Sequence, residues 1–169
     1  MTEQLETDRL ILRRHKPEDA EAYIGFFLSD RARHVGKART QFAAWRNFAM
    51  EAGHWALYGY GPWMVTRKGS DRSIGSIGCW QPKDYPEREL SWLLWEDAEG
   101  QGIAFEAAQA ARAHDYATHR PAALVSYIEA ANKRSIRLAE RLGALLDADA
   151  VSPDPSDLVY RHPWPEVLS

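Results

Sequence analysis

The sequence predicts an α/β protein of the α+β type, in which helices flank a mixed, mostly antiparallel sheet with one parallel, splayed pair of strands at its centre. Two observations predict this fold class. Three short β-rich runs, 63–68, 74–80 and 89–95, follow one another with short turns between them, which is typical of an antiparallel meander. An alanine-rich helical segment, 100–118, then separates the last run from a buried strand at 124–128, and such a crossover makes the flanking strands parallel.

The N-terminal part of the chain is predicted to hold one strand and two helices. Residues 5–14 alternate around three central aliphatic residues and indicate the opening strand. Pro17 begins a helix that runs to about residue 28, because proline is favoured in a first helical turn. A second amphipathic helix is predicted at 41–53, and the glycines within 59–61 interrupt the pattern before the meander.

The C-terminal part is predicted to add one helix and a hairpin. The helix spans 132–142 and ends at Gly143, since glycine adopts the left-handed conformation that closes many helices. The hairpin joins 145–148 to 158–162 around a proline-containing loop. A length of 169 residues suits one domain, so we expect residues 1–169 to form a single domain.

The composition excludes several classes of protein. With 45% hydrophobic and 27% charged residues, the chain matches soluble globular proteins. No apolar run approaches the roughly 20 residues that cross a bilayer, and the acidic N-terminus is unlike a signal peptide, so we expect a cytoplasmic protein without a membrane partner. The formal charge of −3 gives no basic field for nucleic acid, and the six histidines show no metal-ligand spacing. We therefore expect neither a nucleic-acid partner nor a metal.

The segment 100–107 (GQGIAFEA) is the most informative part of the chain. It follows an apolar strand and opens a helix, and the first N–H groups of a helix have no partner within it. Such a helix start attracts anions, so the segment indicates a phosphate site. A Gly-x-Gly pair by itself is equally compatible with a flexible turn.

Four segments together resemble a known family. They are 7–13 (TDRLILR), 74–78 (IGSIG), 89–92 (ELSW) running into 100–107, and 132–135 (NKRS) ending at Leu142-Gly143. Their order and spacing resemble the GNAT superfamily of N-acetyltransferases, most closely its ribosomal-protein-alanine acetyltransferase branch, across nearly the whole chain. The resemblance implies a GNAT-like fold and an acetyl-CoA-dependent transfer of an acetyl group to a primary amine of a protein N-terminus or a small molecule.

The same resemblance implies which residues hold acetyl-CoA. Backbone amides grip its pyrophosphate at Gly100, Gln101, Gly102, Ile103 and Ala104. The backbone of Trp92, Leu93 and Leu94 pairs with the pantetheine arm as an added strand would. Asn132 hydrogen-bonds that arm, and Ser135 donates to the departing CoA thiolate.

Two of these residues also have a purely structural interpretation. Asn132 is a good N-cap for the helix that follows it, and Ser135 is then an ordinary first-turn residue. A capping box would place Glu or Gln three residues after the cap, where Ser135 stands instead, which leaves the serine hydroxyl without a capping function. Both interpretations are open at this point.

Glu89 is the candidate general base. A protonated amine cannot attack a thioester, and a carboxylate at the start of the strand could take the proton directly or through water. Against this, Glu89 follows two charged residues in a turn and could be a solvated side chain. Glu129 and Tyr160 are lesser candidates.

Two features depart from the family pattern or add to it. Asp97 and Glu99 place carboxylates beside the expected phosphate site, and we expect both to point into solvent as partners of the helix dipole. An aromatic group occurs near the second helix and the next strand: Trp45, Trp55, Tyr58, Tyr60 and Trp63. We expect core or interface positions for these rings, with an aromatic-lined acceptor pocket as the alternative.

Direct transfer is the predicted mechanism, without a covalent enzyme intermediate. The single cysteine, Cys79, lies in a strand-like run, where a buried thiol is favoured over a nucleophile. A non-catalytic acetyl-CoA-binding sensor or scaffold is the main alternative, and a nucleotide-binding oxidoreductase is disfavoured because no Gly-x-Gly-x-x-Gly run occurs. The family habit and the aromatic content are compatible with a homodimer.

Overall fold

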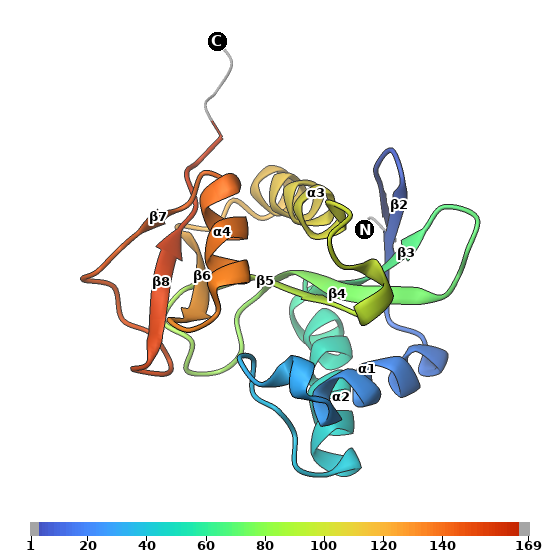
Figure 1. Cartoon of the computed structure of the whole chain (residues 1–169). Coiled ribbons are helices and arrows are strands. Elements are labelled where there is room, and N and C mark those ends of the chain that lie inside the picture. The colour runs from blue at the N-terminus through green and yellow to red at the C-terminus, as the bar shows by residue number, and fades with distance from the viewer. Residues whose placement is uncertain (1–3, 166–169) are drawn as a thin grey trace.

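The computed structural model describes residues 4–165, which form one eight-stranded sheet with helices on both faces. In chain order the elements are β1 (Gln4–Glu6), β2 (Leu10–Arg13), η1 (Pro17–Asp19), α1 (Ala20–Leu28), η2 (Asp30–Ala32), α2 (Gln41–Tyr58), β3 (Pro62–Arg67), β4 (Ser73–Trp80), β5 (Arg88–Leu94), η3 (Glu96–Ala98), α3 (Ile103–Thr118), β6 (Leu124–Glu129), α4 (Lys133–Arg141), β7 (Leu145–Leu146) and β8 (Asp157–Arg161). Figure 1 shows α1 and α2 on one side of the sheet and α3 and α4 on the other.

The centre of the sheet has the predicted topology. The strand order is β1-β2-β3-β4-β5-β6-β8-β7, and every neighbouring pair is antiparallel except β5 and β6. The parallel pair is registered only at Arg88 with Leu124 and at Glu89 with Val125. Beyond Glu89 the two strands diverge, so β5 continues toward its end without a partner on that side. The predicted fold class is confirmed.

The opening strand predicted at 5–14 is wrong in its length, because it is a hairpin of β1 and β2. Its turn is closed by the Thr7 N–H, which donates to the Leu10 carbonyl over 3.0 Å, and by the Leu10 N–H, which donates to the Thr7 hydroxyl over 3.0 Å. Leu5 then stands opposite Leu12. The threonine side chain supplies a local acceptor, which favours a turn over a continuous strand.

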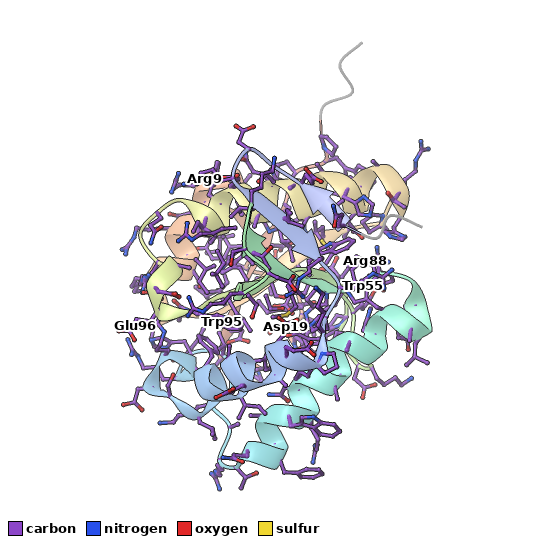
Figure 2. The ribbon with its side chains drawn as sticks, turned by 90° about the vertical axis from the view of Figure 1, so that its right-hand side faces the viewer. Arg9, Asp19, Trp55, Arg88, Trp95 and Glu96 are labelled. Atoms are coloured by element: carbon purple, nitrogen blue, oxygen red, sulfur yellow. The ribbon has the colours of Figure 1, made fainter. Side chains whose placement is uncertain are left out.

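Helix α2 is longer than predicted, because it continues through Gly53 to Tyr58. A glycine inside a helix costs about 1 kcal/mol relative to alanine. Trp55, beyond that glycine, is 7% exposed, packs into the core and donates from its indole nitrogen to the Pro62 carbonyl over 2.6 Å (Figure 2). The burial of a large ring outweighs the glycine penalty. The helix ends at Gly59, whose φ of +76° is the left-handed conformation that glycine adopts readily.

The aromatic residues expected at core or interface positions divide between the core and the surface. Trp55 and Trp63 lie in the main cluster beneath the sheet, whereas Trp45 and Tyr58 are largely exposed. Cys79 is buried and free, as predicted. Within residues 4–165, no helix has the length and apolar character to span a bilayer.

Candidate active site

The divergence of β5 from β6 opens a cleft between α3 and α4 on one side and α1 and α2 on the other. Two adjoining cavities of about 400 and 670 Å³ occupy it. Seven residues line both cavities: Arg33, His34, Val35, Trp92, Leu93, Asn132 and Ser135. They therefore lie where the cavities meet, and the smaller cavity runs from them to the glycine turn before α3.

The glycine turn presents free backbone donors to the smaller cavity. Gly100 and Gly102 both have left-handed φ angles, of +72° and +74°. The first helical bond of α3 runs from the Glu106 N–H to the Gly102 carbonyl. Among the described residues, the N–H groups of Ile103, Ala104 and Phe105 have no hydrogen-bond partner. Free donors at the positive end of a 16-residue helix form an anion site, so this turn could hold a phosphate.

The β1–β2 hairpin fixes the start of α3 from outside the cleft. Arg9, at the hairpin tip (Figure 2), donates to the Gln101 carbonyl over 2.9 Å and pairs with Glu106 over 2.6 Å. The Thr7 hydroxyl donates to the same Glu106 carboxylate over 2.6 Å. These contacts fix the Gln101 carbonyl within the glycine turn and Glu106 in the first turn of α3. Sequence reasoning missed them, although Thr7 and Arg9 belong to a segment that carried the family resemblance.

Four arginines make the smaller cavity cationic: Arg31, Arg33, Arg134 and Arg141. The prediction that Glu99 points into solvent is wrong, because its carboxylate lies between Arg31 and Arg134 and pairs with both. These two guanidinium groups attract the carboxylate more strongly than a helix start does. Asp97 lies at the surface, as predicted, and there pairs with Arg72.

The open edge of β5 leads from the glycine turn to the junction of the cavities. Trp92, Leu93 and Leu94 pair with β4 on one side only. Since β6 pairs with β5 at Arg88 and Glu89 alone, the other side of these three residues faces the cleft. A free strand edge offers backbone donors and acceptors to an extended ligand.

Asn132 caps α4, and Ser135 points to the junction. The Ser135 N–H donates to the Asn132 side-chain oxygen over 3.2 Å, so the structural interpretation of Asn132 is confirmed. The Trp92 indole N–H donates to the Ser135 hydroxyl oxygen over 3.1 Å. The serine hydroxyl proton has no acceptor among residues 4–165. Ser135 can therefore donate to a group in the cleft.

Glu89 lines the larger cavity and is not solvated. It is 8% exposed, and its carboxylate accepts from the Trp80 indole N–H over 2.7 Å. Burial raises its pKa to about 7, against the opposing effect of the Trp80 hydrogen bond. The interpretation of Glu89 as a merely solvated residue is wrong. A carboxylate with a pKa near the working pH is suited to proton transfer.

The lesser candidates are less suited to that role. Glu129 lines the same cavity but pairs with His34 over 3.1 Å. Tyr160 is 6% exposed, packs with Ile128 and Ala139 beneath α4, and does not line either cavity.

The larger cavity has aromatic and acidic walls. None of the five aromatic residues named from the sequence lines it, so the alternative of an acceptor pocket formed by those residues is wrong. Trp55 and Trp63 instead fill the core. The rings that do line it come from α1, β4, β5, β6 and the β4–β5 connection: Tyr23, Phe27, Trp80, Tyr85, Trp92 and Tyr127. Five carboxylates share the lining: Glu51, Glu89, Glu129, Asp154 and Asp157.

Two other reactive side chains near the cleft are structural. Cys79 lines neither cavity, and burial raises the pKa of its thiol, which disfavours the nucleophilic thiolate. Ser126 donates to the Leu90 carbonyl over 2.6 Å and contacts a ring nitrogen of His162 at 2.9 Å. Burial lowers the pKa of His162 to about 3, so this histidine is neutral. Within residues 4–165, no group of three or more His, Cys, Asp or Glu side chains is placed to hold a metal ion.

A sheet opened beside a glycine turn, with a free strand edge leading to a buried carboxylate, is the arrangement of an N-acetyltransferase. A family model described as an acetyltransferase (GNAT) domain matches residues 9–145, so the chain belongs to the GNAT acetyltransferase family. The resemblance to the GNAT family stated from the sequence is confirmed. Membership of this enzyme family argues against both the sensor and the oxidoreductase alternatives.

Solved structures with similar folds agree. An acetyltransferase from Agrobacterium tumefaciens str. C58 is 38% identical, with a TM-score of 0.92, over 97% of this chain and 96% of that chain. A GNAT-family acetyltransferase from Bacillus anthracis is 18% identical, with a TM-score of 0.72, over 94% and 95%. RimL, a ribosomal alpha-N-protein acetyltransferase solved with coenzyme A, is 17% identical, with a TM-score of 0.71, over 94% and 96%. The last two show likeness of fold alone.

Proposed function

We propose that this enzyme transfers the acetyl group of acetyl-CoA directly to a primary amine, of a protein N-terminus or a small molecule. The observation that carries this proposal is the contrast between the two cavities. Four arginines and free helix donors line the smaller one, whereas five carboxylates line the larger one, with Arg33 common to both. They meet at Trp92 and Ser135, where a thioester from one side would face an amine from the other.

The smaller cavity suits the polyphosphate part of acetyl-CoA. Gly100 and Gly102 have a positive φ, which residues with a side chain rarely adopt. A Cβ at Gly100 would meet open space rather than protein. The free N–H groups of Ile103, Ala104 and Phe105 supply neutral donors, and the arginines supply charge. The edge of β5 from Trp92 to Leu94 then matches an extended arm that carries amide groups.

Glu89 is assigned the removal of the proton from the amine. A lysine-type amine with a pKa near about 10.4 is almost fully protonated at neutral pH, and an N-terminal amine near about 7.8 is mostly so. Glu89, with a pKa of about 7, is partly ionised there and can take the proton directly or through a water molecule. Its negative form also attracts the ammonium into the larger cavity.

Ser135 is assigned the protonation of the leaving thiolate. The Trp92 indole fixes the orientation of its oxygen and leaves the hydroxyl proton available. In this scheme the amine nitrogen forms its bond to the acetyl carbon and the carbon–sulfur bond breaks. The sulfur receives the Ser135 proton, and the Ser135 oxygen takes back, through water, the proton that the new amide nitrogen loses. No residue carries the acetyl group in between.

A screen of amines with radiolabelled acetyl-CoA tests the proposal. We expect labelled product and stoichiometric release of free thiol with at least one class among peptide N-termini, amino acids and small diamines. Acetyl-CoA at about 100 times its dissociation constant should also stabilise the fold by about 2.7 kcal/mol, whereas NADH should not. Binding of acetyl-CoA without acetylation of any amine, or the absence of binding, would contradict the proposal.

A further inference from the structure

The wall of the larger cavity carries two facing carboxylates in addition to Glu89. Glu129 of β6 and Asp157 of β8 are direct partners in the antiparallel register, and both line the cavity. Directly opposite residues on neighbouring strands point to the same face of the sheet, and like charges there destabilise the pair. A protein that keeps such a pair at a cavity wall gains from a cation that enters the cavity.

Asp157 has the uncompensated charge of this pair. Glu129 pairs with His34 over 3.1 Å, and the neighbouring Asp154 accepts from both the N–H and the hydroxyl of Ser156. In the described part of the chain, the Asp157 carboxylate has no hydrogen bond and no salt bridge. Burial, Asp154 and Glu129 together raise its pKa, in that order of importance, which means that its negative charge is disfavoured there.

A line of aromatic rings connects Asp157 to Glu89. Tyr85 lines the larger cavity together with both carboxylates, and burial, followed by the charges of Glu89 and Asp157, raises its pKa. Tyr85 meets Tyr127 edge-on at 5.6 Å and Trp80 at 5.9 Å between ring centroids. Aromatic faces attract organic cations, and the attraction grows where water is excluded. The cavity thus combines the Glu89 and Asp157 carboxylates with a π-rich wall, while its cationic residue Arg33 is one that it shares with the smaller cavity.

We propose that the acceptor is an amine with a second positive charge, whose reacting nitrogen lies at Glu89 while its second cation binds at Asp157. The inference rests on the proposed function, because the reacting nitrogen is the one that Glu89 deprotonates. A monoamine neutralises only the Glu89 end. A diamine also relieves the repulsion between Asp157 and Glu129, and its methylene chain covers the aromatic rings between the two ends.

The test compares 1-aminobutane with diamines of three, four and five carbons as acceptors, at a fixed pH near neutrality. Wild-type enzyme should show kcat/KM at least tenfold higher for the best diamine, beyond the statistical advantage of its second amine. Asp157→Asn should reduce that preference about tenfold, which is about 1.4 kcal/mol. Asp149 is an exposed carboxylate in the connection that leads into β8, and it does not line the cavity, so Asp149→Asn is the matched control and should keep the preference.

Thermal unfolding gives a second measurement that does not require turnover. The diamine should raise the melting temperature of the wild type more than 1-aminobutane does, and Asp157→Asn should lose this difference. If both amines are acetylated equally well, the inference is overturned while the proposed function stands. If neither is acetylated but the Asp157-dependent stabilisation occurs, the inference stands and the proposed transfer to these amines fails. If acetylation and stabilisation are both absent, the inference and the proposed transfer to these amines are both overturned.

Discussion

Glu89→Gln removes the charge of the proposed base and keeps its shape, so it separates proton transfer from packing. A positioned general base contributes roughly 100- to 10,000-fold to a rate, and we expect kcat to fall by about 100-fold or more. In the wild type, kcat/KM should rise with pH through about 7, as Glu89 loses its proton. The variant should lose that inflection and keep only the one that belongs to the free amine.

The same substitution has a measurable effect on stability. The pKa of Glu89 is about 7 in the folded protein, above its ordinary value of 4.5. The stability that follows from this shift is therefore fully present below 4.5 and is lost as pH rises through 7. The shift corresponds to about 3 kcal/mol above neutrality. Glutamine does not ionise, so the stability of the variant relative to the wild type should increase by about 2–3 kcal/mol between about pH 5 and pH 9.

Urea unfolding at the two pH values measures this change, and initial rates across the same range measure the catalytic effect. Glu87→Gln is the control, because Glu87 stands two residues away, pairs with Arg161 over 2.8 Å and lines neither cavity. It should retain the inflection near pH 7. A stability difference between Glu89→Gln and the wild type that does not vary with pH would refute the burial argument. An unchanged pH–rate profile would refute the assignment of the base.

Three further substitutions test other parts of the site. Ser135→Ala should lower kcat on the order of 100-fold in a thiol-release assay, with little change in KM for acetyl-CoA, because the backbone cap to Asn132 remains; an unchanged kcat would exclude the serine as proton donor. Gly102→Ala should cost about 1–2 kcal/mol of stability by urea unfolding and weaken binding of CoA by calorimetry, since its φ is +74°; the control Gly53→Ala, in a helix with open space around it, should stabilise the protein instead. Cys79→Ala should leave kcat unchanged, because Cys79 lines neither cavity. Loss of turnover in this variant would instead support an acyl-cysteine intermediate.

Local patterns in the sequence predicted the elements that position the cofactor end of the site. The meander, the turn at Gly100 and the cap at Asn132 each depend on residues close together in the chain, and their interactions are visible as spacing. The end of α2 was not predicted, because the burial of Trp55 depends on strands that the helix pattern does not contain.

Side-chain contacts between distant segments could not be predicted in the same way. Arg9 pairs with Glu106, and Glu99 lies between Arg31 and Arg134, only because the fold brings a hairpin, a 3-10 turn and α4 around one helix start. The wall of the larger cavity is a stronger example of the same limit. Its residues come from helices, strands and connections, and no single stretch of sequence shows that they face one cavity.

Backbone groups form one part of the cleft and side chains form the other, which is useful for engineering the enzyme. Donors at the start of α3 and along the edge of β5 belong to the backbone, whereas the wall of the larger cavity consists of replaceable groups such as Tyr85, Tyr127 and Asp157. A mutant library that randomises only those wall positions should therefore yield new acceptor preferences while every member still takes up the donor. Directed evolution of this scaffold can therefore begin with the wall of the larger cavity and leave the start of α3 and the edge of β5 unchanged.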